Sequence, residues 1–145
     1  MSKEYTVEEN KAWRARQPQK MVVVKVIIKS DEGRILLAKP DYKKSWQLPG
    51  GGVDDGESPE QAVVREIKEE LNLEISEDSL RIKGTIYKRD EELLFVIYES
   101  NELIPENTKL TVQENEITDF QFAVPSDVVS LLSDYYSDFW NNYIS

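Results

Sequence analysis

Three glutamates, Glu66, Glu69 and Glu70, lie three and four residues apart in the stretch REIKEELNL. On a helix these spacings make the carboxylates neighbours, and like charges so placed weaken the helix by about 0.2–0.5 kcal/mol per pair. A helical wheel places them at the edge of the apolar stripe, whereas a purely solvated charged face would lie opposite that stripe. Partial burial at this edge is costly for carboxylates, and a bound divalent cation would offset the cost.

The kind of metal follows from the residues that the chain lacks. It contains no histidine and no cysteine, which excludes Ser-His-Asp and Cys-His nucleophiles, disulfides and the usual zinc ligand sets. A site built from oxygen ligands alone suits Mg²⁺ or Mn²⁺. The nearby DDGES lacks the alternating aspartates of an EF-hand, and no Gly-Lys-Ser/Thr follows the glycines, so a Walker A loop is also excluded.

Two consecutive segments would position these carboxylates. The stretch WQLPGGGVDDGES contains so many glycines, prolines and aspartates that it predicts a shaped loop without regular structure. The next residues carry helix-start signals, with Ser58 as N-cap, Pro59 at the first helical position and Gln61 completing a capping box. We therefore expect a helix over residues 59–71 that begins directly after the loop.

The rest of the chain predicts strands and helices in irregular alternation. The expected strands form two hairpins and one later strand: 21–30 with 34–39, 80–89 with 93–100, and 116–124. A capping box predicts a short helix over residues 7–16, and the spacing of aromatic residues predicts a closing helix over residues 125–143. This order favours an α/β fold with a mixed β-sheet flanked by helices.

The length, charge and hydropathy of the chain limit the number of domains, the binding partners and the cellular location. A chain of 145 residues suits one domain over residues 1–145. The formal net charge of −10 repels a phosphate backbone, which argues against long DNA or RNA as a partner. The first twenty residues lack the apolar core of a secretory signal, and no apolar run approaches the ~20 residues of a membrane span. We therefore expect a cytoplasmic protein with no membrane partner.

Residues 51–73 follow the pattern Gly-x5-Glu-x7-Arg-Glu-Ile-x-Glu-Glu-x-Asn-Leu. The pattern resembles the signature of the Nudix hydrolases and departs from it only at Asn72, where the family has glycine. Asparagine is the next-best residue for the left-handed conformation that ends a helix, so the backbone geometry is expected to survive. The resemblance implies a Nudix-type α/β/α sandwich that hydrolyses a nucleoside diphosphate linked to another group, with magnesium.

The resemblance also implies roles for individual residues. The implied metal ligands are Glu66, Glu69, Glu70 and the carbonyl oxygen of Gly50. Glu66 is the first candidate for the general base that accepts the proton of the attacking water, since no histidine exists. Glu57 and Arg65 would pair and brace the loop against the helix.

Outside the signature, the resemblance implies one further acidic residue from a late loop. Glu116 and Glu114 both fit this role, and a solvated loop charge is the alternative for each. Trp46 is expected to pack beneath the glycine-rich loop rather than to stack on a base. Three lysines are either phosphate-steering residues or ordinary exposed residues: Lys39, Lys43 and Lys44.

We therefore expect a Mg²⁺-dependent pyrophosphohydrolase of a small nucleotide. One alternative is a Nudix-fold module that binds a nucleotide or ADP-ribose without cleaving it, and another is a metal-stabilised interaction domain. All the signature carboxylates are present, which favours the enzyme. No second motif names the substrate, and the resemblance is compatible with a homodimer.

Overall fold

A four-stranded mixed sheet forms the centre of the protein, in a computed structural model that describes residues 4–42, 44–113 and 115–145. Its strand order is β3 (Gly50–Gly52), β1 (Met21–Ile27), β5 (Leu93–Ser100) and β4 (Leu80–Lys88). The central pair β1 and β5 is parallel, and the two outer pairs are antiparallel. Strands β2 (Ile35–Pro40) and β6 (Ile117–Ala123) form a second, two-stranded antiparallel sheet.

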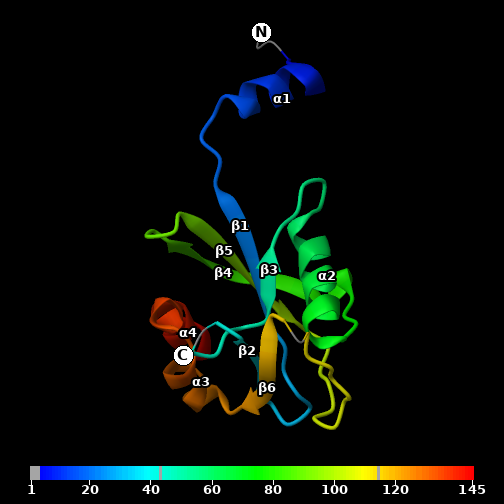
Figure 1. Cartoon of the computed structure of the whole chain (residues 1–145), viewed down its shortest axis with the longest axis vertical. Helices are drawn as coiled ribbons and strands as arrows, with labels where there is room; N and C mark the ends of the chain where they lie inside the picture. The colour runs from blue at the N-terminus through cyan, green and yellow to red at the C-terminus, as the bar shows by residue number, and fades with distance from the viewer. Residues whose placement is uncertain (1–3, 43, 114) are drawn as a thin grey trace.

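Helices cover both sides of the four-stranded sheet (Figure 1). Helix α2 (Pro59–Leu71) packs on one side, while α3 (Pro125–Leu131) and α4 (Ser137–Ile144) lie on the other. Each side has its own core: Val24 and Val26 of β1 pack with α2, whereas Ile27 packs with Tyr136 and Trp140. The predicted α/β sandwich with a mixed sheet flanked by helices is confirmed.

Helix α2 forms where its start signals predicted it. The Ser58 side chain accepts from the backbone N–H of Gln61 at 3.1 Å, and the Gln61 side chain accepts from the backbone N–H of Ser58 at 2.9 Å. The helix ends at Asn72, whose φ of 54° and ψ of 38° are left-handed. Asparagine therefore adopts the conformation that glycine would supply at this position.

The prediction that the whole glycine-rich stretch is a loop was wrong at its centre. Residues 50–52 form strand β3 and pair with β1. Gly50 has a φ of 144°, and a Cβ there would overlap the carbonyl oxygen of Val24. Glycine is thus required because the two backbones approach closely, and this requirement does not prevent the ladder from forming.

The first predicted hairpin was also wrong, although its turn is present. Residues 28–30 meet residues 34–36 across a short turn, with the Leu36 N–H donating to the Ile28 carbonyl at 2.9 Å. Beyond that turn, β2 leaves and pairs with β6. Both edges of β1 are already occupied, by β3 and by β5, so no edge remains for β2. The second predicted hairpin, β4 with β5, and the later strand β6 are confirmed.

The closing segment is broken, whereas one continuous helix was predicted. Leu132 is extended, with φ −75° and ψ 158°, and separates α3 from a 3₁₀ turn at residues 134–136 and from α4. The break lets the Leu131 carbonyl accept from the backbone N–H of Trp46 at 2.9 Å. The hydrogen bond to Trp46, in the segment before β3, therefore replaces a continued helix, although the aromatic spacing favours one.

Helix α1 (Val7–Ala15) forms within the predicted range of residues 7–16 and has the expected Thr6 capping box. It stands apart from the sheet and its covering helices (Figure 1), and none of its residues is buried. Within the described part of the chain, no helix has both the length and the apolar character that a membrane span requires.

Candidate active site

A pocket of about 460 Å³ lies beside β3 and combines two kinds of lining. Its acidic wall consists of Glu66 and Glu70 from α2 and Glu116 from the segment before β6. Its aromatic wall includes Phe95 from β5 and Tyr135 from the 3₁₀ turn, with ring centroids 5.3 Å apart. One cavity therefore offers oxygen ligands together with flat apolar surfaces.

Glycines in β3 bring the carboxylates of α2 against this pocket. The backbone N–H of Gly50 donates to Glu70 Oε2 at 3.3 Å. A Cβ at Gly51 would lie 2.5 Å from the carboxyl carbon of Glu66. The absence of a side chain at Gly51 therefore makes room for the Glu66 carboxylate, while the backbone of Gly50 holds Glu70.

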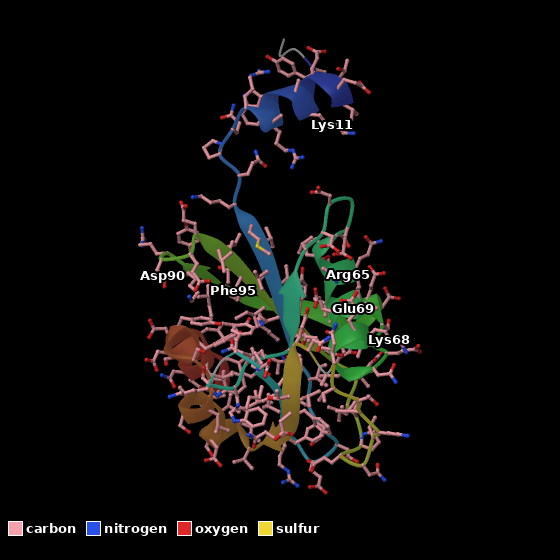
Figure 2. All side chains as sticks on the ribbon, in the orientation of Figure 1. Lys11, Arg65, Lys68, Glu69, Asp90 and Phe95 are labelled. Carbon is pink, nitrogen blue, oxygen red and sulfur yellow. The ribbon has the colours of Figure 1, made fainter. Side chains whose placement is uncertain are left out.

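Arg65 connects the loop after β3 to helix α2, and Figure 2 labels it on that helix near Glu69. Its Nε and Nη2 donate to the two carboxylate oxygens of Glu57 at 2.7 and 2.8 Å. Nη2 also donates to the Gly52 carbonyl at 2.9 Å, while Nη1 donates to Glu66 at 2.9 Å and to Glu69 at 3.2 Å. Forked contacts of this kind fix the relative positions of the elements that they join.

The electrostatics of Glu70 are those of a carboxylate held away from water. Its residue is only 5% exposed. Burial raises the pKa of Glu70 to about 8, the nearby Lys25 charge opposes the rise, and the charges of Glu66 and Glu116 add to it. A cation placed at this carboxylate would remove a large part of the energetic cost.

Glu66 and Glu57 have opposite pKa shifts because their surroundings differ. Burial raises the pKa of Glu66, and the hydrogen bond from Arg65 opposes the rise. The Arg65 guanidinium and the backbone N–H of Asp54 instead lower the pKa of Glu57 to about 2. At neutral pH, Glu57 is therefore a permanent anion that partners Arg65, whereas Glu66 takes up a proton more readily.

The donor set suits a hard divalent cation. In the described ranges, no three carboxylates converge on a common point, because Arg65 holds Glu66 and Glu69 through hydrogen bonds. The pocket nevertheless offers carboxylate oxygens from α2 and from the β6 side, and the buried Glu70 lacks full charge compensation. Such oxygen ligands fit Mg²⁺ or Mn²⁺ better than zinc or copper.

The model of the NUDIX domain family matches residues 19–139. This chain belongs to the Nudix family. The predicted membership of the Nudix hydrolases is therefore confirmed. The match covers the sheet, the acidic helix and the pocket, and it begins after α1.

Curated relatives with similar sequences are RNA pyrophosphohydrolases. The protein of Aeromonas hydrophila is 52% identical over 50 residues, which are 34% of this chain and 29% of that protein. The protein of Hydrogenovibrio crunogenus is 48% identical over 61 residues, or 42% of this chain and 36% of that protein. The matched part of the Nudix chain thus spans about a third of the length of these relatives.

Solved structures agree with the Nudix fold. The MutT protein of Methanosarcina mazei superposes with a TM-score of 0.73 at 19% identity, covering 88% of this chain and 96% of that one. A MutT Nudix hydrolase of Burkholderia pseudomallei superposes with a TM-score of 0.70 at 24% identity, covering 86% and 98%.

The Nudix fold brings together most of the residues singled out in the sequence. Glu66, Glu70, Gly50 and Glu116 line the pocket. Glu69 does not line it, and its half-exposed side chain contacts Arg65. The competitor of Glu116, Glu114, lies outside the described residues, as does Lys43.

Trp46 packs against the core that contains Tyr136 and Trp140, and it does not line the pocket. Neither do Lys39 and Lys44.

Sequence reasoning missed the residues of this Nudix pocket that come from the sheet and from the 3₁₀ turn. Lys25, Phe95 and Tyr135 all line it, and so does Lys88. A signal existed for Lys25, since it interrupts the apolar run MVVVKVII. No local pattern distinguishes Phe95 or Tyr135 from ordinary core aromatic residues, because their place in the pocket depends on how distant elements pack.

Proposed function

We propose that this Nudix protein, as a single domain over residues 1–145, uses Mg²⁺ or Mn²⁺ to hydrolyse a pyrophosphate bond in a small nucleotide. The substrate would be a nucleoside diphosphate linked to another group. The observation that carries the proposal is one pocket of about 460 Å³ whose lining combines Glu66 and Glu70 with Gly50 and with the aromatic residues Phe95 and Tyr135. A pocket of this volume has the size of typical small-molecule sites.

The residues proposed to hold the cation are Glu66, Glu69, Glu70 and the carbonyl of Gly50. When bound, the cation supplies positive charge that holds the diphosphate and stabilises the charge that develops during an in-line displacement. Glu69 is the exposed member of this set and stays near the others through its 3.2 Å contact with Arg65. The ion pair of Arg65 with Glu57 fixes the position of helix α2 relative to the loop before it.

Glu66 is proposed to accept the proton of the attacking water. Its carboxyl group is half-buried beside the pocket, and burial raises its pKa, which brings its proton affinity closer to the working pH. Glu116 lines the same pocket and is the second candidate for this proton transfer, or a further ligand. Phe95 and Tyr135 offer flat apolar surface to the nucleoside part of the substrate.

Two features bear on the size of the substrate. The relatives named RNA pyrophosphohydrolases share about half of the aligned residues, but only over about a third of their length. The net charge of −10 opposes contacts with a long phosphate backbone. We therefore favour a small nucleotide, with the expected cytoplasmic location, and include a 5′-triphosphorylated oligonucleotide in the test.

The test is product release from a panel of nucleoside diphosphate derivatives and that oligonucleotide, with Mg²⁺ or with chelator. The wild-type protein should cleave at least one substrate only when Mg²⁺ is present. Glu70→Gln should lose this activity while its unfolding temperature in metal-free buffer stays equal or rises, since burial of a carboxyl whose pKa is raised to about 8 is unfavourable at neutral pH and an uncharged amide avoids this cost.

Glu74→Gln, at an exposed ion pair with Lys68, is the matched control and should cleave like the wild type. Binding of a nucleotide without any cleavage would instead favour the non-catalytic module. Full turnover by Glu70→Gln at limiting Mg²⁺ would contradict the assigned metal site.

A further inference from the structure

Lys25 occupies an unusual place for a charged residue. It lies in the middle of β1, where its neighbours Val24 and Val26 are fully buried. Successive side chains of a strand point to opposite faces, so those valines pack with α2 while Lys25 points to the other face. There, together with Val23, it lines the candidate active site.

The strand register places Lys25 beside the acidic wall. Lys25 is opposite Gly50 in the β1–β3 ladder, and the backbone N–H of Gly50 donates to Glu70. Lys25 is therefore paired, on the adjacent strand, with the residue whose N–H holds the carboxylate. The charge of Lys25 acts on Glu70 directly, since it opposes the rise of the Glu70 pKa.

The charges of the described pocket lining are unequal. Four carboxylates line it, Glu66, Glu70, Glu91 and Glu116, against two lysines, Lys25 and Lys88. The Lys88 ammonium forms an ion pair with Glu91 in the turn between β4 and β5, and it lies 5.2 Å from the centroid of the Tyr135 ring. Of these two lysines, Lys25 is therefore the one associated with Glu70.

We propose that Lys25 is a phosphate-binding residue whose ammonium group contacts the diphosphate of the substrate. The inference rests on the proposed function. Without metal, Lys25 partly compensates Glu70. With a divalent cation at this carboxylate, an anion that contacts both the cation and the ammonium is attracted by two positive charges. A diphosphate held at the acidic wall supplies that anion, and an ammonium donates three hydrogen bonds to its oxygens.

The test measures binding of inorganic pyrophosphate to the full-length, Mg²⁺-loaded protein by titration calorimetry. Lys25→Met removes the charge with little change in length, and it should raise the Kd for pyrophosphate at least about tenfold, because a charge-assisted hydrogen bond is lost. Lys25→Arg keeps the charge and should recover most of the affinity. Lys39→Met makes the same change of net charge on β2, outside the pocket lining, and should bind like the wild type.

A second measurement separates phosphate binding from a purely structural role. Lys25→Met should bind Mg²⁺ alone at least as tightly as the wild type, since a positive charge beside Glu70 is removed. It should also keep its unfolding temperature, because a partly buried lysine between two buried valines is replaced by an apolar residue of similar length. In turnover assays the KM of the cleaved nucleotide should rise by more than kcat falls.

Three results would overturn the inference: no pyrophosphate binding by the wild type, a Kd of Lys25→Met within twofold of the wild type, or an equal loss in Lys39→Met. Failure of the proposed function is recognised separately. If the wild type cleaves nothing in the nucleotide panel but binds pyrophosphate through Lys25, the proposed hydrolysis is wrong and the proposed phosphate contact of Lys25 is supported.

Discussion

Arg65 joins β3, the following loop and α2 through one guanidinium group. Its contacts with Glu57, Gly52 and Glu66 explain why the signature contains an arginine and a glutamate eight residues apart. Only Arg offers several donors in a rigid plane, so lysine could not replace it here. The contacts of this one residue thus hold helix α2 in its position against strand β3.

The Arg65 contact predicts how stability depends on pH. The pKa of Glu57 is lowered from 4.5 to about 2, so its ion pair contributes stability above pH 4.5 and loses it as the pH falls through 2. Glu57→Gln should therefore unfold more easily than the wild type at pH 7, and the two should converge toward pH 2. Denaturant unfolding at several pH values measures this difference.

The control is Glu74→Gln, which removes one exposed charge that pairs with Lys68. A gap between wild type and Glu57→Gln that stayed constant down to pH 2 would show that the ion pair does not carry the stability.

Among the secondary-structure elements, α2 could be predicted from the sequence and β3 could not. The bounds of α2 could be predicted because capping residues and apolar spacing are local signals. The glycine strand could not, since only its partner β1 explains why side chains are excluded there. The pairing of β2 with β6 and the break at Leu132 likewise depend on which edges and hydrogen-bond donors distant segments leave available.

Two adjacent glycines allow a test of the role of β3. A Cβ at Gly51 would lie 2.5 Å from the carboxyl carbon of Glu66, whereas one at Gly52 would meet only the terminal methyl of Met21 at 2.6 Å. Gly51→Ala should therefore displace Glu66 and lower kcat/KM about 100-fold, since an error of about 1 Å in a site can cost that much. Gly52→Ala is the matched control, because the methionine end can move.

Steady-state kinetics compare the two variants, and circular dichroism checks that both are folded. Equal activity of Gly51→Ala and the wild type would mean that Glu66 does not need its observed position.

At the scale of the whole fold, the described part of the chain contains the elements of a Nudix domain and, before them, helix α1. The family match begins at residue 19, and α1 lies before it with Trp13 58% exposed. The candidate site draws on α2, β1, β3, β5 and the segments beside β6 and α4, but not on α1. Glu66 and Glu70 could be predicted because both belong to one local signature. Phe95 and Tyr135 could not, because they reach the pocket from separate elements.

Removal of α1 should leave the fold and the site intact. A chain that begins at residue 18 should keep the unfolding temperature of the full chain and its turnover, because no residue of α1 is buried. Thermal unfolding and the nucleotide assay measure both. A fall of more than about 5 °C in unfolding temperature, roughly 1 kcal/mol for a domain of this size, would mean that α1 packs on the fold.

Turnover of the cleaved nucleotide by Glu66→Gln at saturating Mg²⁺ tests the central claim most directly. We predict a fall in kcat of about 10²–10⁴-fold, as expected when a general base is removed, with Glu74→Gln retaining wild-type turnover. A kcat of Glu66→Gln within twofold of the wild type would contradict the assignment of the acidic wall as the catalytic site.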